Sequence, residues 1–508
     1  FYNKLFIKNN TNFNYNLFII LILVLTITEY YFVGNHSAYD WLSIHEIPLI
    51  KKDLNIEYLI NDFYTNRAFN TPKIIYVKFI NFINIFNINL DIFLLFINIL
   101  VILLTPIFTF KILTNFNSSS YFFIYNNNFL TISISLIFSL GYLSLIDNDL
   151  GGWSSFTNWK FINPMTISNL ICLYLFYNIQ KKNYNNFLNY ILIFIATLLH
   201  PLTAIFYYIL IYFILNDYKK NLFKNFLLIN FDKLFLFIPI FFGSIIIFIT
   251  FYSVDNHNSE IYSNIYTHIR HPHHYLVSSF FSIYYLIWIC LPVIFLFIFS
   301  IIKNYLGIKI SIYFSIISIS SVGLQFFFSE VYIVNLISTK LSPIRIYCYI
   351  FFVYIILLNI LLNNLSYKIE LSNNSSLPKF IINLSIFIFL SVILLTLKKE
   401  PLHRIPDAQN TLKFTKNDLS SKYYSDSHSE WLLSFIRAYS DKEIYSDNLF
   451  IFEENTSLAW LELKNSGKKI RNLEKNNFNE FKCELFKKDI DAYLANKDYT
   501  FFNNQSDI

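Results

Sequence analysis

The sequence predicts an all-α polytopic membrane protein followed by a small C-terminal α/β domain. Its 508 residues are 55% hydrophobic and only 14% charged, whereas a soluble domain carries about 25% charged residues. Apolar runs close to the ~20 residues that cross a bilayer as a helix recur along the chain. After position 397, charged residues become denser and apolar runs shorter. We therefore expect a transmembrane domain over residues 1–397 and a soluble domain over residues 398–508. Within the soluble domain the pattern predicts a short amphipathic helix over Ser429–Tyr439 and strands over Leu449–Phe452 and Leu458–Leu463.

About eleven apolar segments have the length expected of transmembrane helices, or nearly so. Two short ones meet at His200-Pro201, where proline kinks or breaks a helix. These two form either a hairpin or one kinked helix. The expected spans are Leu17–Val33, Asp91–Leu113, Phe129–Ile146, Pro164–Ile179, Phe187–Leu199, Leu202–Leu215, Leu234–Tyr252, Val277–Ser300, Ile308–Phe328, Ile344–Leu362 and Phe380–Leu397.

Lysine gathers in alternate loops, for example at Lys181-Lys182 and Lys219-Lys220. An excess of positive charge marks the cytoplasmic side of a membrane protein, which predicts a cytoplasmic N-terminus. This orientation treats Ile74–Ile85 as a surface helix rather than a span. The outer side then holds, besides loops over residues 147–163 and 329–343, a loop over residues 34–90 and a loop over residues 253–276, which we call the first and the second outer loop. It also holds the C-terminal domain, which is therefore extracytoplasmic.

Charge and cysteine usage exclude several classes of protein. The net charge of +6 is spread over the loops, which suits an anionic lipid surface and gives no sign of a nucleic-acid partner. Three of the four cysteines lie in apolar spans, so no disulfide framework is expected. No Walker motif, glycine-rich nucleotide loop or Ser-His-Asp order is present. No expected span carries a charge near its centre, which argues against ion-coupled transport.

The first outer loop is acidic and aromatic, and its acids are the candidate catalytic groups. Such a carboxylate can act as a general base or bind a hard divalent cation. The alternative is a solvated loop whose acids pair with Lys51, Lys52 and Arg67. The candidates are Asp40, Glu46 and Asp62.

Histidine, of which the chain has only ten, is concentrated in the second outer loop, which reads HIRHPHHY from His268 to Tyr275. An arginine fork with imidazoles around it can bind phosphate or pyrophosphate. A transition metal held by His273 or His274 with an acid is a second interpretation. An interfacial loop with incidental histidines is the third. The candidate phosphate-binding residues here are Arg270, His271, His273 and His274.

Two further positions are candidates for the same anion. His200 lies at the break between two short helices, and an ionisable group there suggests a site, although a capped surface turn is an equally good interpretation. Arg345 lies at the outer end of an expected transmembrane helix. Its side chain there either extends to the membrane–water interface or reaches an anionic lipid head group.

The architecture resembles the GT-C class of polytopic glycosyltransferases, which use polyprenyl-phosphate sugar donors. Three stretches, His45–Pro48, Asn61–Asn66 and Arg270–Tyr275, resemble signatures of a functionally uncharacterised bacterial multipass family. The resemblance covers roughly residues 30–350 and reaches the tail weakly. GT-C enzymes often carry paired acids at the end of the first span, where this chain has Glu29-Tyr30, so the assignment of the base is open.

The resemblance implies an integral protein of a bacterial inner (plasma) membrane. This protein would move a sugar from a polyprenyl-phosphate donor to a lipid or glycan acceptor on the extracytoplasmic face. Glu46 or Asp62 would deprotonate the acceptor hydroxyl, and the cationic loop would neutralise the phosphate left behind. Metal dependence stays open. The alternatives are a transporter or flippase for a lipid-linked glycan, and a non-catalytic membrane scaffold.

Overall fold

A computed structural model describes most of the chain and divides it into two compact units. Several sequence-based predictions lie outside the described residues: most of three expected spans, and the candidate site residues Asp40, His271, His273, His274 and Arg345. The structure describes residues 45–69, 71–86, 88–118, 131–132, 134–135, 163–181, 186–214, 234–251, 261–270, 275–280, 283–332, 343, 347–372, 413–425, 430–445, 457–488 and 490–494.

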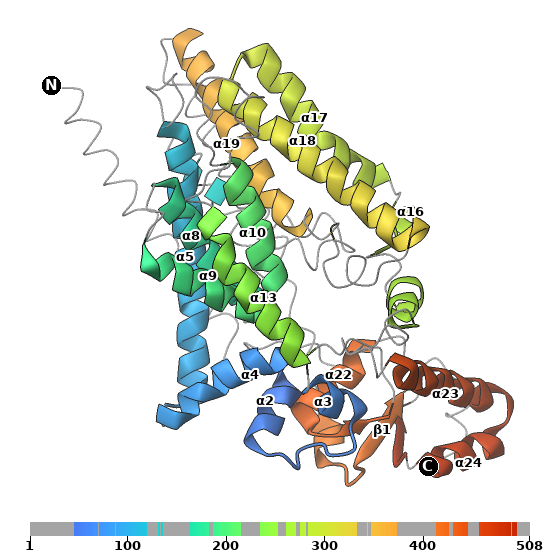
Figure 1. The fold of residues 1–508 in the computed structure, drawn as a ribbon. Coiled ribbons are helices and arrows are strands. Elements are labelled where there is room, and N and C mark those ends of the chain that lie inside the picture. Colours follow the sequence, from blue (N-terminus) through green and yellow to red (C-terminus); the bar gives the residue numbers. More distant parts are fainter. Residues whose placement is uncertain are drawn as a thin grey trace. The chain divides into compact units, whose positions relative to one another are not determined.

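The first unit comprises residues 1–41, 91–248 and 271–398, and every element described in it is helical (Figure 1). Its apolar core is shared among α8, α10, α18 and α19. The break expected at His200-Pro201 is present, because α9 ends at Leu199 and α10 begins at Pro201. The helices are α5 (Leu90–Ser118), α8 (Pro164–Gln180), α9 (Phe187–Leu199), α10 (Pro201–Ile214), α13 (Phe237–Phe251), α16 (Val277–Phe280), α17 (Ile283–Ile302), α18 (Tyr305–Phe326), η5 (Phe327–Val331) and α19 (Tyr347–Ser372).

Several helices of this unit are strongly apolar. Among the described residues, two helices, Ile92–Phe116 and Tyr305–Val331, are long and apolar enough to cross a membrane, and five others are apolar but shorter. Helix α13 leaves Phe241 51% and Phe242 56% exposed, and a soluble monomer rarely exposes a large continuous apolar face. The described part of the chain is thus mostly helical and holds two helices with the length and composition to cross a membrane, while the number of about eleven spans stays a prediction.

Helices α17 and α18 form a tight antiparallel pair, visible in Figure 1. The turn between them needs a left-handed residue, Lys303, with φ 57°. Asn304 then caps α18 by accepting a hydrogen bond from the Gly307 N–H at 2.7 Å. A Cβ on Gly307 would lie 2.4 Å from the Phe299 ring. The glycine therefore permits the close contact between the two helices.

The second unit joins three segments that are far apart in the sequence: residues 42–90, 249–270 and 399–508. The first segment of this unit contributes α2 (Ile47–Leu54), α3 (Phe63–Ala68), α4 (Lys73–Asn81) and η2 (Phe82–Phe86), and the second contributes η4 (Ile265–Arg270). At nine residues, α4 is too short to cross a bilayer, in agreement with the surface-helix interpretation. The tail contributes β1 (Lys422–Ser425), α22 (Glu430–Ser440), β2 (Glu443–Ile444), α23 (Ser457–Asn476), α24 (Phe478–Lys487) and β3 (Ala492–Leu494).

The tail is an α/β structure, as the sequence predicted, although its strands are not the expected ones. The sheet has the order β2-β1-β3 with parallel pairing, in which Tyr423 faces Ile444 and Tyr424 faces Tyr493. The amphipathic helix expected over residues 429–439 is confirmed as α22. The strand expected at Leu458–Leu463 is wrong, because this segment begins α23. The strand expected at Leu449–Phe452 lies outside the described residues.

Candidate functional site

A buried ion pair joins the first loop to the tail within the second unit. The Arg437 Nε–H donates to both oxygens of Asp62, at 3.0 and 2.9 Å. Asp62 is fully buried and Arg437 is 1% exposed. The Arg437 guanidinium also lies over the Tyr64 ring, 5.1 Å from its centroid. Because an isolated charge is costly to bury, this contact ties the loop to α22.

The remaining hydrogen-bonding capacity of Asp62 is used by the backbone. Asp62 caps α3 by accepting from the Thr65 N–H at 2.7 Å, and its other oxygen accepts from the Ile444 N–H at 3.0 Å. Each oxygen therefore has two short contacts, including the shared Arg437 donor. A general base must come within hydrogen-bond reach of a substrate proton. The geometry thus fits a structural role for Asp62 better than a catalytic one.

Further polar contacts support the union of loop and tail. Lys51 Nζ donates to Asp441 Oδ1 at 2.5 Å and to the Ala438 carbonyl at 2.9 Å. The Tyr58 hydroxyl donates to the same Asp441 oxygen at 2.8 Å, and burial, with Asp441 beside it, raises the pKa of Tyr58. The Asn61 N–H donates to Glu443 Oε1 at 2.8 Å.

The acids of the loop do not pair as the solvated-loop interpretation expected. Lys51 pairs with a tail residue, as above, and Lys52 donates to the backbone carbonyls of Ile56 and Tyr58, at 3.1 and 3.4 Å. Arg67 has no hydrogen bond or ion pair from its guanidinium within the described part of the chain. The partners of the acids are Lys73 for Glu46, Lys78 for Asp53 and Arg437 for Asp62.

Glu46 has the one incompletely satisfied carboxylate among the candidate acids that the structure describes. It precedes α2 and is 6% exposed. One of its oxygens lies 3.8 Å from Lys73 Nζ, and the other, Oε2, has no hydrogen-bond partner among the described residues. A buried acceptor without a partner is costly. Among the candidate acids that the structure describes, Glu46 is therefore the one with a buried oxygen that keeps its capacity to accept a hydrogen bond.

Lys73 and two tyrosines form the surroundings of Glu46. Lys73 Nζ donates to the Tyr64 hydroxyl at 3.1 Å, and that hydroxyl donates to the His45 carbonyl at 3.2 Å. Burial would lower the pKa of Lys73, but Tyr64 and Glu46 more than offset it and the pKa is raised. Burial, together with the Glu46 carboxylate, raises the pKa of Tyr64 and of Tyr76. Near neutral pH the lysine is therefore charged and the tyrosines are protonated.

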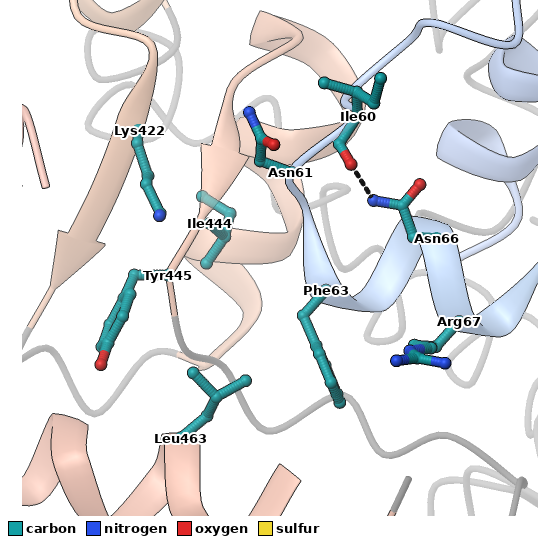
Figure 2. Close-up of a pocket in the computed structure, with 9 residues that line it drawn as sticks. All are labelled: Ile60, Asn61, Phe63, Asn66, Arg67, Lys422, Ile444, Tyr445 and Leu463. Atoms are coloured by element: carbon teal, nitrogen blue, oxygen red, sulfur yellow. Dashed lines mark hydrogen bonds between the residues drawn. The ribbon is translucent and has the colours of Figure 1, made fainter. Parts of the chain in front are cut away.

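An open pocket lies on another face of α3, between that helix and the tail (Figure 2). Its volume is about 450 Å³. Two cations line it, Arg67 from α3 and Lys422 from β1, and among the described lining residues none is acidic. The lining consists of Ile60, Asn61, Phe63, Asn66, Arg67, Lys422, Ile444, Tyr445 and Leu463.

The predicted phosphate-binding residues are described only in part. Arg270 ends η4, so its backbone belongs to the same unit as Glu46. His200 lies in the first unit, where its Nδ1 is 2.7 Å from Thr203 Oγ1 and 3.3 Å from the Thr203 backbone nitrogen. This geometry is that of a cap on α10. No group of three or more His, Cys, Asp or Glu side chains suited to a metal is found among the described residues.

Sequence reasoning missed Arg437, Lys73 and Lys422 as site residues. Arg437 is a charge within the amphipathic α22, and nothing local indicates that it is buried. Nothing in the sequence indicates that its partner is Asp62, which lies 375 positions away. No family model, no curated protein and no solved structure matches the chain.

Proposed function

We propose that the protein is a membrane-embedded glycosyltransferase with its chemistry in the second unit. It would transfer a sugar from a polyprenyl-phosphate donor to a lipid or glycan acceptor. The observation that carries the proposal is Glu46, a buried carboxylate with one oxygen that has no hydrogen-bond partner in the part of the chain that the structure describes. Such a group suits a general base that takes the proton of an acceptor hydroxyl.

Lys73 is the residue that would position this base. Its charge lies 3.8 Å from one oxygen of Glu46 and it is held by the Tyr64 hydroxyl. This leaves Oε2 as the oxygen for the acceptor. We assign the base to Glu46 rather than Asp62, because both oxygens of Asp62 are engaged by Arg437 and by backbone N–H groups.

The phosphate half of the proposal relies on the second outer loop. Arg270 would hold the donor phosphate through its planar fork. The other candidates for this phosphate, His271, His273, His274, His200 and Arg345, belong to the first unit and stay predictions from the sequence. The presence of η4 and α2 in one unit supports this pairing of base and cation. The membrane would be a bacterial inner membrane with the second unit on its extracytoplasmic side.

Proteoliposomes holding a labelled polyprenyl-phosphate sugar test the proposal. A glycosyltransferase cleaves the sugar from its carrier when an acceptor is present. A flippase moves the intact carrier to the opposite leaflet, and a scaffold does neither. Carrier movement without cleavage, or no effect of the protein at all, would contradict the proposal.

Arg270 offers a second test with a conservative control. Arg270→Ala should weaken donor binding about ten-fold or more, because a charge-assisted hydrogen bond is worth roughly 1.5–3 kcal/mol. Arg270→Lys should lose less, since the ammonium keeps the charge without the fork. Donor affinity equal to wild type in Arg270→Ala, in protein of normal stability, would remove this loop from the site.

A further inference from the structure

The pocket on α3 has two cationic side chains whose charge is uncompensated by any described lining residue. Arg67 is exposed, and its guanidinium makes no hydrogen bond or ion pair within the described residues. Lys422 Nζ has weak contacts, a carbonyl of Lys488 at 3.4 Å and the Tyr445 ring at 5.6 Å, and its charge also acts on Asp491, whose carboxylate accepts from the Lys422 backbone N–H at 3.0 Å. Cations that line a concave site without an acid in its lining raise the local concentration of anions.

The walls of the pocket fit an organic ligand rather than a bare ion. Phe63, Leu463 and Ile60 give it apolar surface (Figure 2). Its volume of about 450 Å³ falls within the range of small-molecule sites. Apolar and aromatic side chains with a few charged groups are the usual lining of such sites. A ligand with a ring and an anionic substituent would use both kinds of surface.

The polar groups of the pocket are held in place by the fold. The Asn66 amide donates to the Ile60 carbonyl at 2.5 Å, the contact drawn in Figure 2, and to the Asp62 carbonyl at 2.8 Å. The Asn61 N–H is fixed by Glu443. The Tyr445 hydroxyl donates to Ser466 Oγ, or accepts from it, at 3.0 Å. The walls are therefore preorganised, while the two cationic ends are available to a ligand.

We infer that this pocket binds a small organic anion, a carboxylate or phosphate on a ring-shaped body, through Arg67 and Lys422. That the body is a saccharide rests on the proposed function, for which an acidic acceptor sugar would suit the site. The binding of an anion does not rest on it. Failure of the protein to cleave a sugar donor would not contradict this inference. Failure of the pocket to bind an anion would likewise not contradict the proposed function.

Calorimetric titration of the full chain in nanodiscs of neutral lipid tests the inference. The probes are glucuronate, glucose 1-phosphate and uncharged glucose. At least one of the two anions should bind saturably and glucose should not, and the anion that binds identifies the carboxylate or the phosphate as the recognised group. Absence of saturable binding by either anion at millimolar concentration would overturn the inference.

Variants localise the binding. Arg67→Gln and Lys422→Gln should each weaken the anion about ten-fold or more. The matched control is Lys468→Gln, which removes an exposed charge of α23 away from the pocket and should leave affinity unchanged. Equal unfolding temperatures of the variants show that the fold is kept. Wild-type affinity in both pocket variants would equally overturn the inference.

Discussion

Replacing Arg437 should release the first loop and the tail from each other. Arg437→Met keeps an apolar stem of similar length and removes the guanidinium. Asp62 would then stay fully buried without its arginine and keep the hydrogen bonds from the Thr65 and Ile444 N–H groups. Removing one partner of a buried ion pair costs about 3–5 kcal/mol, so we expect a loss of that size in the stability of the second unit.

Hydrogen exchange measures this loss at both ends of the contact. The Thr65 and Ile444 amides donate to Asp62, so peptides that contain them report on the loop and on the tail separately. Since about 1.4 kcal/mol is a factor of ten, exchange of both should accelerate roughly 100- to 4,000-fold, up to the limit of full unfolding. An Asp62→Asn and Arg437→Met double variant should lose less than the sum of the single losses, because the two residues interact directly.

Arg67→Met provides the control, because Arg67 is an exposed arginine of α3, the helix that Asp62 caps. Its effect should stay within about 0.5 kcal/mol. If Arg437→Met left protection in both peptides within a few-fold of wild type, the loop would not be anchored through this pair. Faster exchange in the tail peptide alone would also contradict the account, since it requires the two segments to open together.

Three further predictions concern the hairpin, the orientation and alkaline stability. Gly307→Ala should lower the free energy of unfolding by about 1–3 kcal/mol in thermal unfolding, because the added methyl group would lie 2.4 Å from the Phe299 ring. Gly323→Ala is the control and should be neutral or stabilising, because a Cβ there meets nothing within 4 Å. Cys483 is exposed. In a variant that keeps this cysteine alone, a membrane-impermeant thiol reagent should therefore label the protein in intact cells. Labelling that requires permeabilised cells would contradict the proposed orientation. Burial raises the pKa of Tyr58 above its ordinary 10.0. The contribution of the protonated Tyr58 hydroxyl to the free energy of unfolding is therefore present below about pH 10 and is lost as the pH rises above it. Tyr58→Phe should therefore lower the alkaline slope in urea titrations by up to about 1.4 kcal/mol per pH unit, and an unchanged slope would count against its burial.

The helical elements were largely predictable because their signals are local. An apolar stretch bounded by Asn186 and His200 gave α9 its ends, since Asn186 caps the helix by accepting from the Leu188 N–H. The amphipathic pattern of α22 was visible for the same reason. The sequence predicts a strand at the start of α23, because a short apolar run is compatible with the periodicity of a strand as well as with that of a helix. Its helical face becomes evident only when Trp460, Gly467 and Ile470, all buried, are taken together.

The candidate site was less predictable because it is made by long-range contacts. Glu46 and Asp62 look alike in the sequence, as acids of one loop. What separates them is Arg437, 375 positions from Asp62, which satisfies one carboxylate and leaves the other to Lys73. Burial decides the role of each residue, and burial here depends on how the tail meets the loop. Charge and spacing alone do not contain that information.

The most direct test of the central claim is the rate of sugar transfer by Glu46→Gln in proteoliposomes. General-base catalysis contributes about 10²- to 10⁴-fold, so we expect a loss in that range with donor binding intact. Asp53→Asn is the matched control, because Asp53 is also an acid of this loop, with a side chain that is 6% exposed and paired with Lys78. Its folded variant should keep transfer within a few-fold of wild type. Transfer by Glu46→Gln at the wild-type rate would contradict the assignment of the base and the mechanism built on it.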